Sequence, residues 1–305
     1  MDRETQIQKF RQACYNGNLI LAKELTKTYN LTDEDARSNE NLALQWACSK
    51  GHTSTAQWLV ETFKLTIEDA RSKNNQALRY ACENGHISTV QWLVETFKLT
   101  IEDARSKNNF ALIYACAGGH TSTAQWLVET FKLTIDDART NENEALRYAC
   151  MKGHTPTAQW LVEYFNLTDK DARSEKNYAL RYTCSDDHIS TAQWLVETFK
   201  LTIEDARSDE NLALRWACLK GHTSTAQWLV KTFKLTIEDV QSEDNFALRR
   251  ACLNSHTSTA QWLLDTYYTV EDALEISKMN NLDSTMEEWL QNYQPIGVLT
   301  KAVEM

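Results

Sequence analysis

Cysteine and histidine recur four residues apart along the chain, from Cys48 and His52 to Cys252 and His256. A thiol beside an imidazole could act as a nucleophile with its general base, and both side chains are common metal ligands. The pair occurs in seven copies, however, whereas a catalytic centre is normally built once. We therefore interpret each cysteine as a small core residue and each histidine as a turn residue that hydrogen-bonds backbone, and we expect no metal site.

The remaining sequence carries no motif typical of catalysis or of cofactor binding. It has no glycine-rich phosphate loop, no G-x-S-x-G elbow and no isolated pair of carboxylates. We therefore expect neither enzymatic activity nor a cofactor. The net charge of −10 argues against general binding to nucleic acid or to anionic membranes. No run of 18 apolar residues is present, so no membrane span is predicted.

The eight cysteines also reveal how the chain is organised. They follow one another at intervals of 34 residues from Cys14 to Cys252, without deviation. A fixed period of this length indicates a solenoid of stacked units, each of which packs against its neighbours. Equivalent cysteines in adjacent units should stand roughly 8–10 Å apart, beyond the ~7 Å between Cα atoms that a disulfide tolerates. We expect free, buried thiols and a reducing compartment.

A reducing compartment corresponds to an intracellular location, either cytoplasmic or nuclear. The first residues, Met1 to Lys9, are charged and do not resemble a signal peptide. Export into a host cell stays open, because a signal peptide removed before residue 1 would leave no trace. The expected state is a monomer.

Each unit carries signals for two helices and a short third turn, which the unit over residues 72–105 illustrates. Asn75 is the expected N-cap of the first helix, and Gly85 suits the left-handed position that ends it. The second helix is expected from about residue 88 to residue 97. Thr100 and Asp103 then form a Thr-x-x-Asp capping box for a third helical turn. No stretch alternates as a strand would, so the predicted fold is all-α.

This unit reads A-L-R-Y-A-C-x-x-G-H over residues 77–86, followed by V-x-x-L-V over residues 90–94. It resembles the T-P-L-H-x-A-A-x-x-G-H-x-x-V-V-x-x-L-L pattern of ankyrin repeats. The resemblance covers about residues 5–268 as eight copies and implies an ankyrin-like helical-repeat solenoid. The period is 34 rather than 33 residues, and an L-T-x-x-D-A-R-S segment replaces the β-turn. We therefore expect a short helix where ankyrin repeats project a hairpin. Tetratricopeptide repeats share the period, but their spaced Trp-Leu-Gly-Tyr and terminal proline are absent.

The predicted organisation is a capping repeat over residues 1–38, a repeat array over residues 39–268 and a C-terminal cap and tail over residues 269–305. Beyond the array, residues 283–293 form an amphipathic stretch that we interpret as the cap. The tail over residues 295–305 is more apolar than a cap requires, so it could be a second docking segment. Within the array, Asp187 and Ser255 replace the turn glycine, either as tolerated drift or as a place where the array bends or binds.

The first helices have one constant and one variable face. Small residues such as Ala43, Leu44 and Cys48 hardly change between units, whereas residues six, three and two before each cysteine vary. The variable face is rich in Trp, Tyr and Arg, the residue types that dominate binding hot spots between proteins. The candidate partner-binding residues are Trp46, Arg79, Tyr80, Phe110, Tyr114, Arg147, Tyr148, Tyr178, Arg181, Tyr182, Arg215, Trp216 and Arg249.

Two interpretations of this face stay open. The aromatic rings could pack between units while the arginines pair with acids of the L-T-x-x-D-A-R segment. Alternatively, the face could form a surface for a partner protein with an acidic or mixed surface, which the resemblance places on the concave side. We predict a protein-interaction scaffold. The alternative function is an adaptor or secreted effector that recruits a host target to another machine, such as a ubiquitin ligase.

Overall fold

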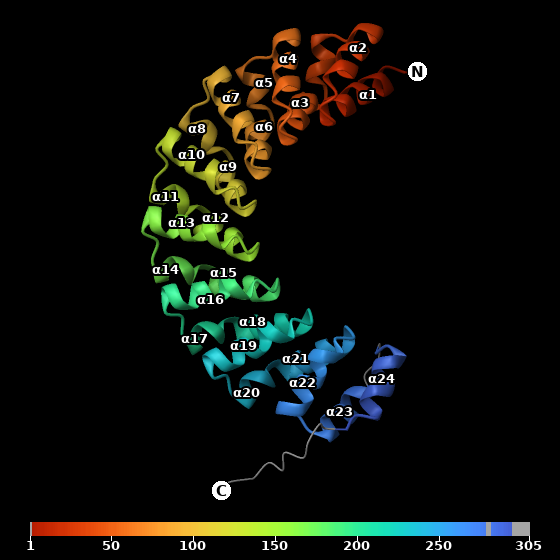
Figure 1. The fold of residues 1–305 in the computed structure, drawn as a ribbon, viewed down its shortest axis with the longest axis vertical. Coiled ribbons are helices and arrows are strands. Elements are labelled where there is room, and N and C mark those ends of the chain that lie inside the picture. The colour runs from red at the N-terminus through yellow and green to blue at the C-terminus, as the bar shows by residue number, and fades with distance from the viewer. Residues whose placement is uncertain (1, 279–281, 295–305) are drawn as a thin grey trace. The chain divides into compact units, whose positions relative to one another are not determined.

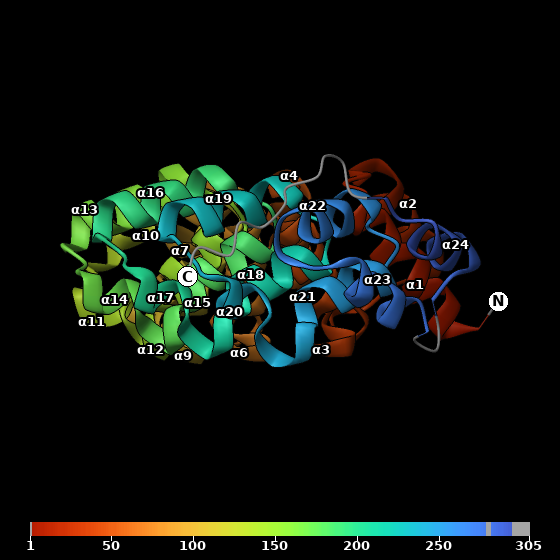
Figure 2. The same ribbon diagram turned by 90° about the horizontal axis from the view of Figure 1, so that it is seen from below.

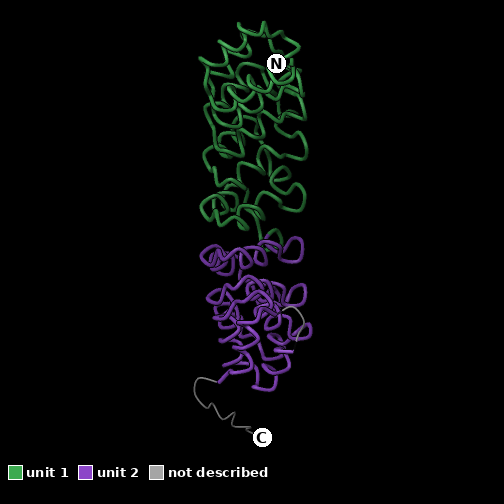
Figure 3. Tube along the Cα trace, turned by 90° about the vertical axis from the view of Figure 1, so that its right-hand side faces the viewer, with its two compact units in different colours: residues 1–171 green, residues 172–305 purple. Residues whose placement is uncertain are grey.

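The computed structural model describes residues 2–278 and 282–294, which form 24 helices and contain no strand. The all-α prediction is confirmed. The chain divides into two compact units, residues 1–171 (unit 1) and residues 172–305 (unit 2), whose boundary falls within α14 (Asp169–Ala172) (Figure 3).

Unit 1 consists of repeats that each contribute a first helix, a second helix and a short third turn (Figure 1). Its first helices are α1 (Arg3–Tyr15), α3 (Asp33–Ser49), α6 (Ser72–Glu83), α9 (Ser106–Ala117) and α12 (Thr140–Met151). Its second helices are α2 (Leu19–Tyr29), α4 (Thr53–Phe63), α7 (Ile87–Phe97), α10 (Thr121–Phe131) and α13 (Thr155–Phe165). The separate third turns are α5 (Ile67–Ala70), α8 (Ile101–Ala104) and α11 (Ile135–Ala138). Each first helix packs on the first helix of the next repeat, so first and second helices form two layers (Figure 2).

Unit 2 repeats the same pattern and ends in two further helices. Its first helices are α15 (Ser174–Ser185), α18 (Ser208–Leu219) and α21 (Ser242–Leu253). Its second helices are α16 (Ile189–Phe199), α19 (Thr223–Phe233) and α22 (Thr257–Tyr267). The third turns are α17 (Ile203–Ala206) and α20 (Ile237–Val240), and the final pair is α23 (Val270–Ser277) and α24 (Ser284–Gln291).

The constant face of the first helices forms the core, as expected. Ala43, Leu44 and Cys48 are almost completely buried, and all eight cysteines are free and fully buried. Burial raises the pKa of Cys14 to about 12, so this thiol stays protonated near neutral pH. The cysteines therefore serve as small apolar core residues.

In the first repeat, the turn between the first and second helix favours glycine for two reasons. Gly17 has a φ of +67°, a left-handed conformation that favours glycine. A Cβ atom there would also lie 2.5 Å from Nδ1 of His52, because this imidazole covers the glycine of the preceding repeat. His52 Nε2 lies 3.1 Å from the carbonyl oxygen of Tyr15, which confirms that the histidine bonds backbone. Asp187 keeps the left-handed conformation in place of glycine, and its Oδ1 accepts a 2.6 Å hydrogen bond from the Thr225 hydroxyl.

The third turn confirms the capping box. Asp103 Oδ2 accepts the backbone N–H of Thr100 at 2.8 Å, and Ile101–Ala104 is helical where ankyrin repeats project a hairpin. Asp103 also binds a guanidinium from the preceding repeat. Arg71 donates from Nε to Oδ1 at 2.7 Å and from Nη2 to Oδ2 at 3.0 Å. The same aspartate therefore caps its own third turn and binds the arginine of the preceding repeat.

The prediction that Asn75 caps the first helix is wrong. Lys73, Asn74 and Asn75 all have positive φ values of 51° to 58° and form a left-handed turn before the helix. Asn75 donates from Nδ2 to Asp103 at 3.3 Å, while its Oδ1 accepts no hydrogen bond from the described residues. An N-cap needs an extended backbone so that its side chain can reach the first-turn amides, and the left-handed conformation prevents this. Equivalent turns occupy residues 39–41, 107–109, 141–143, 175–177, 209–211 and 243–245.

The amphipathic stretch near the C-terminus forms α24, which packs against α23. Met286, Leu290 and Tyr293 are buried, and the Tyr293 hydroxyl donates to Asp265 Oδ1 at 2.5 Å. This stretch therefore covers the last repeat. The tail over residues 295–305, the candidate for a second docking segment, lies outside the described residues.

Candidate functional site

Four aromatic residues of the variable face form a row across unit 1. Trp46, Tyr80, Tyr114 and Tyr148 occupy equivalent positions on α3, α6, α9 and α12, and each is partly exposed. These helices pack on one another in this order, so the four rings follow one another along one side of the unit. We call these four residues the aromatic row. Their exposed edges offer large, fairly rigid apolar area with polar tips.

Ring contacts hold parts of this face in place. The Tyr15 and Trp46 rings meet edge to face with centroids 5.4 Å apart, and Phe110 and Tyr114 lie 5.1 Å apart on the same helix. Burial raises the pKa of both Tyr114 and Tyr148, so the two phenols stay protonated at neutral pH. The row can therefore donate hydrogen bonds while it contributes apolar area.

Unit 2 carries its own aromatic group. Tyr178 and Tyr182 are stacked with ring centroids 3.9 Å apart, and Tyr182 meets Trp216 of the next repeat edge to face at 4.7 Å. All three side chains are partly exposed. The packing interpretation thus holds for these rings, which also reach solvent, and partner binding by them stays a prediction.

The arginines of the variable face have a different environment. Arg79 donates from Nε to the Asn74 carbonyl and from Nη2 to the Lys73 carbonyl, both at 2.9 Å. It is only 5% exposed. Arg181 and Arg215 are buried as well and donate to carbonyls of their own left-handed turns. Arg147 and Arg249, which are partly exposed, make the same kind of contact.

These contacts stabilise the left-handed turns that an arginine follows. Each left-handed residue in these turns costs roughly 1–2 kcal/mol, and charged hydrogen bonds to the turn carbonyls offset part of that cost. The expectation that the arginines pair with acids of the L-T-x-x-D-A-R segment is therefore wrong for Arg79, whose partners are backbone oxygens. In the next repeat Ile113 takes this position and offers no donor.

Sequence reasoning missed the tips of these left-handed turns. The first two residues of each turn are exposed and vary from repeat to repeat, with Asp209 alone partly buried. We call them the turn tips. In unit 1 they are Asn39, Glu40, Lys73, Asn74, Lys107, Asn108, Asn141 and Glu142; in unit 2 they are Glu175, Lys176, Asp209, Glu210, Glu243 and Asp244. In each repeat these two residues stand between a constant serine or threonine and a constant asparagine. Their variation at that place could have been recognised from the sequence alone.

The turn tips also differ in charge between the two units. Those of unit 1 carry two lysines and two glutamates, whereas those of unit 2 carry five carboxylates and one lysine. Several tip charges are paired, as in Lys73 with Glu40 at 3.2 Å and Lys176 with Asp209 at 3.0 Å. The edge of unit 2 is therefore the more acidic one.

The cysteine and the histidine of each repeated pair have separate environments. Each cysteine sulfur is buried, and the histidine at the same turn faces the preceding glycine and a backbone carbonyl, as His52 does. No group of three or more potential metal ligands gathers anywhere in residues 2–278 and 282–294. Over those residues no helix has the length and apolar character that crossing a membrane needs.

Comparison with known families agrees with this architecture. The family described as "Ankyrin repeats (3 copies)" matches residues 10–103, 95–173 and 180–273, which together cover most of the sequence. No curated protein matches the chain. The matched residues include the capped third turns, the glycine–histidine turns and the aromatic face described above. The chain belongs to the ankyrin repeat family.

Proposed function

We propose that this protein is a binding scaffold whose aromatic row and neighbouring turn tips hold a partner protein. Ankyrin repeats are generally protein–protein interaction modules, and proteins built from them are typically not enzymes. The fold alone does not identify a partner, because the same architecture serves many. The proposal therefore rests on which residues vary and where they lie.

The observation that carries the proposal is the coincidence of variation with exposure. The repeats are near copies in their core, yet residues differ at the turn tips and at the position six residues before each cysteine, as in Gln76, Phe110 and Glu144, where side chains reach solvent beside the aromatic row. Packing alone would favour uniform residues at equivalent positions, as it does for the buried cysteines. Partly exposed Tyr and Trp next to variable charged residues are the composition of protein-binding surfaces.

The charges of the turn tips support a partner with a mixed rather than a uniformly acidic surface. Within unit 1 the turn tips carry both signs, with lysines at residues 73 and 107 and glutamates at residues 40 and 142. Charges at such positions chiefly govern the association rate and the choice of partner. The aromatic rings supply most of the affinity.

A triple substitution in the aromatic row tests the proposal. A partner is first identified by affinity capture and mass spectrometry, then purified and titrated directly. The variant Y80A/Y114A/Y148A should weaken its binding by at least about 30-fold, because each truncated hot-spot ring costs roughly 1–2 kcal/mol or more. The matched control E95A/E129A/E163A removes exposed side chains from the second helices of the same repeats and should bind as the parent does.

Urea unfolding of both variants shows whether each is still folded, so that a loss of binding can be distinguished from a loss of structure. If the alanine variant unfolds, Y80F/Y114F/Y148F keeps the packed rings, removes only the hydroxyls and serves as a second comparison. Unchanged binding by a folded alanine variant, or equal loss in the control, would show that the partner lies elsewhere.

We extend the proposal to cellular context in two respects. The eight free, buried thiols support work in a reducing compartment, either cytoplasmic or nuclear. An adaptor or effector role requires a second surface, and the tail over residues 295–305 is one candidate segment for it. Deleting that tail should abolish one of two interactions and preserve the other, and retention of both would argue against the adaptor role.

A further inference from the structure

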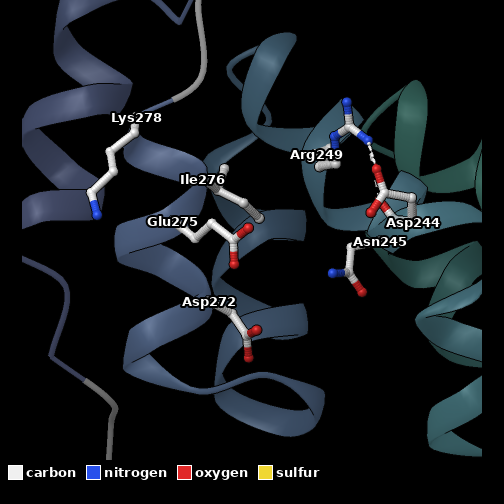
Figure 4. A pocket seen from close by; sticks show the side chains of 7 residues that line it. All are labelled: Asp244, Asn245, Arg249, Asp272, Glu275, Ile276 and Lys278. Atoms are coloured by element: carbon white, nitrogen blue, oxygen red, sulfur yellow. Dashed lines mark hydrogen bonds and ion pairs between the residues drawn. The ribbon is translucent and has the colours of Figure 1, made fainter.

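A cavity of about 210 Å³ lies at the end of unit 2, between the last left-handed turn and α23. Figure 4 shows Asp244, Asn245 and Arg249 on one wall and Asp272 and Glu275 on the other. The carboxylate of Glu275 and the amide of Asn245 point toward one another across the space. The walls therefore present mainly oxygen atoms and negative charge.

The cations near this cavity do not neutralise the α23 wall. Arg249 is paired with Asp244 on its own helix, and Lys278 points away from Asp272 and Glu275 (Figure 4). Among the residues that the structure describes, Asp272 accepts hydrogen bonds from Thr269 alone, at 2.7 Å from the N–H and 2.8 Å from the hydroxyl. Its carboxylate faces no described cation.

Asp272 is the last of eight equivalent capping-box aspartates, and the other seven each hold a guanidinium. In unit 2, Arg207 donates from Nε to Asp239 Oδ1 at 2.8 Å and from Nη2 to Oδ2 at 2.9 Å. Each of these arginines precedes its aspartate by 32 residues. The other pairs are Arg3 with Asp35, Arg37 with Asp69, Arg71 with Asp103, Arg105 with Asp137, Arg139 with Asp171 and Arg173 with Asp205.

The eighth arginine is absent because Gln241 takes its place. Gln241 Nε2 donates to the Tyr267 carbonyl at 2.9 Å, which matches the contact of Arg37 Nη2 with the Lys64 carbonyl at 2.9 Å. The glutamine thus reproduces the backbone contact but supplies no charge. In the other repeats the guanidinium also binds the capping-box aspartate. Here that aspartate is Asp272, and its carboxylate lines the cavity without an arginine.

We propose that this cavity binds the guanidinium of an arginine side chain presented by a partner protein. The same carboxylate geometry binds arginine seven times within this chain, so the receptor chemistry is already formed. A carboxylate suits the planar fork of arginine better than the point charge of lysine. The volume is sufficient, since an engineered cavity of roughly 150 Å³ accommodates benzene. The site is distinct from the aromatic row and does not depend on it.

The test uses the full chain and three small probes. Nα-acetyl-arginine amide, the lysine analogue and the neutral citrulline analogue are titrated while NMR shifts of the chain are followed. The arginine probe should bind saturably and at least about tenfold more tightly than the citrulline probe. D272N should reduce that affinity about tenfold, whereas E271Q, which removes an exposed carboxylate outside the cavity on the same helix, should leave it unchanged.

A second variant keeps the proposal testable even if D272N does not fold. Q241R restores the arginine of the other repeats, so its own guanidinium should occupy Asp272, abolish probe binding and raise the melting temperature. Equal binding of the arginine and citrulline probes would overturn the proposal. So would undiminished binding to folded Q241R. Neither result bears on the aromatic row, which the triple alanine variant tests separately.

Discussion

The guanidinium of Arg105 donates from Nε and Nη2 to the two carboxylate oxygens of Asp137, at 2.7 and 2.9 Å. Arg105 ends the third turn of one repeat, and Asp137 caps the third turn of the next. Asp137 is 5% exposed, and burial alone would raise its pKa. The bonds from Arg105 and from the Thr134 N–H outweigh burial and hold that pKa below its usual value. Adjacent repeats are thus joined by a charged contact as well as by apolar packing.

Replacing Asp137 with asparagine should destabilise unit 1. The substitution removes the charge that pairs with the guanidinium and strengthens the hydrogen bond from the Thr134 N–H, so we expect a loss of about 1–2 kcal/mol in the free energy of unfolding. Urea denaturation followed by circular dichroism measures it. The control D136N changes the exposed neighbour in the same turn and should cost less than about 0.5 kcal/mol. Equal effects of both variants would contradict the role of the pair.

Acid should weaken the protein within a defined pH window. Burial by itself raises the pKa of Asp103, Asp137 and Asp205. The hydrogen bonds from the preceding arginine and from backbone have the larger, opposite effect, so the pKa of each carboxyl lies below its usual value. A folded-state pKa below the unfolded value of about 3.9 gives stability above that pH, which is lost as pH falls through the folded value. The urea midpoint should therefore drop between about pH 5 and pH 3.

One histidine adds to the acid response at higher pH. The pKa of His86 is lowered chiefly by burial, so its protonation should cost stability once the pH falls below about 6.5. The aspartate carboxylates titrate at lower pH, so their response is followed below pH 5. D103N should flatten the slope there, and an unchanged slope would show that these carboxylates do not control acid unfolding.

The cysteines should be almost inert in the folded protein. Burial raises the pKa of Cys14, Cys218 and Cys252 to about 12, and the thiolate is the reactive form. Reaction with a chromogenic disulfide reagent at pH 8 should be slower by about a hundredfold or more than in concentrated urea, where all eight thiols should react. Rapid labelling of several thiols under native conditions would indicate that the repeats open readily.

Gly17 should not tolerate even alanine. The variant G17A combines an unfavourable left-handed backbone with a Cβ atom 2.5 Å from His52 Nδ1. We expect a loss of about 1–3 kcal/mol in the free energy of unfolding. In the double variant G17A/H52A the imidazole no longer obstructs Cβ, so the two effects should be less than additive. Strict additivity would show that the backbone conformation alone demands glycine.

Much of the fold could be predicted from the sequence because local signals repeat. The 34-residue period, the glycine at each turn and the Thr-x-x-Asp box each act within a few residues, and the helices lie where these signals placed them. Asn75 misled the prediction because asparagine favours both N-caps and left-handed turns. The structure places Asn75 in the left-handed turn, whose carbonyls Arg79 binds from the following helix.

The candidate site was also predicted from the sequence only in part. Sequence comparison between repeats identified the variable face and its aromatic residues, because variation among near copies is visible without coordinates. It could not show that Arg79 and Arg181 are buried against backbone while Lys73 and Glu175 reach solvent from the same turns. Arg79 and Arg181 lie in the helices that follow these turns and reach back to the turn carbonyls, and the sequence pattern does not reveal the turns.

By itself, the sequence determined the repeat length, the helical class, the buried side of each helix and the absence of a recognisable catalytic motif. Only the tertiary structure decided which charges meet, because each arginine of the third turn finds its aspartate 32 residues further along the chain. Such a contact depends on how one repeat stacks on the next. For the same reason, it becomes apparent only once the repeats are stacked that Asp272 pairs with no cation among the described residues.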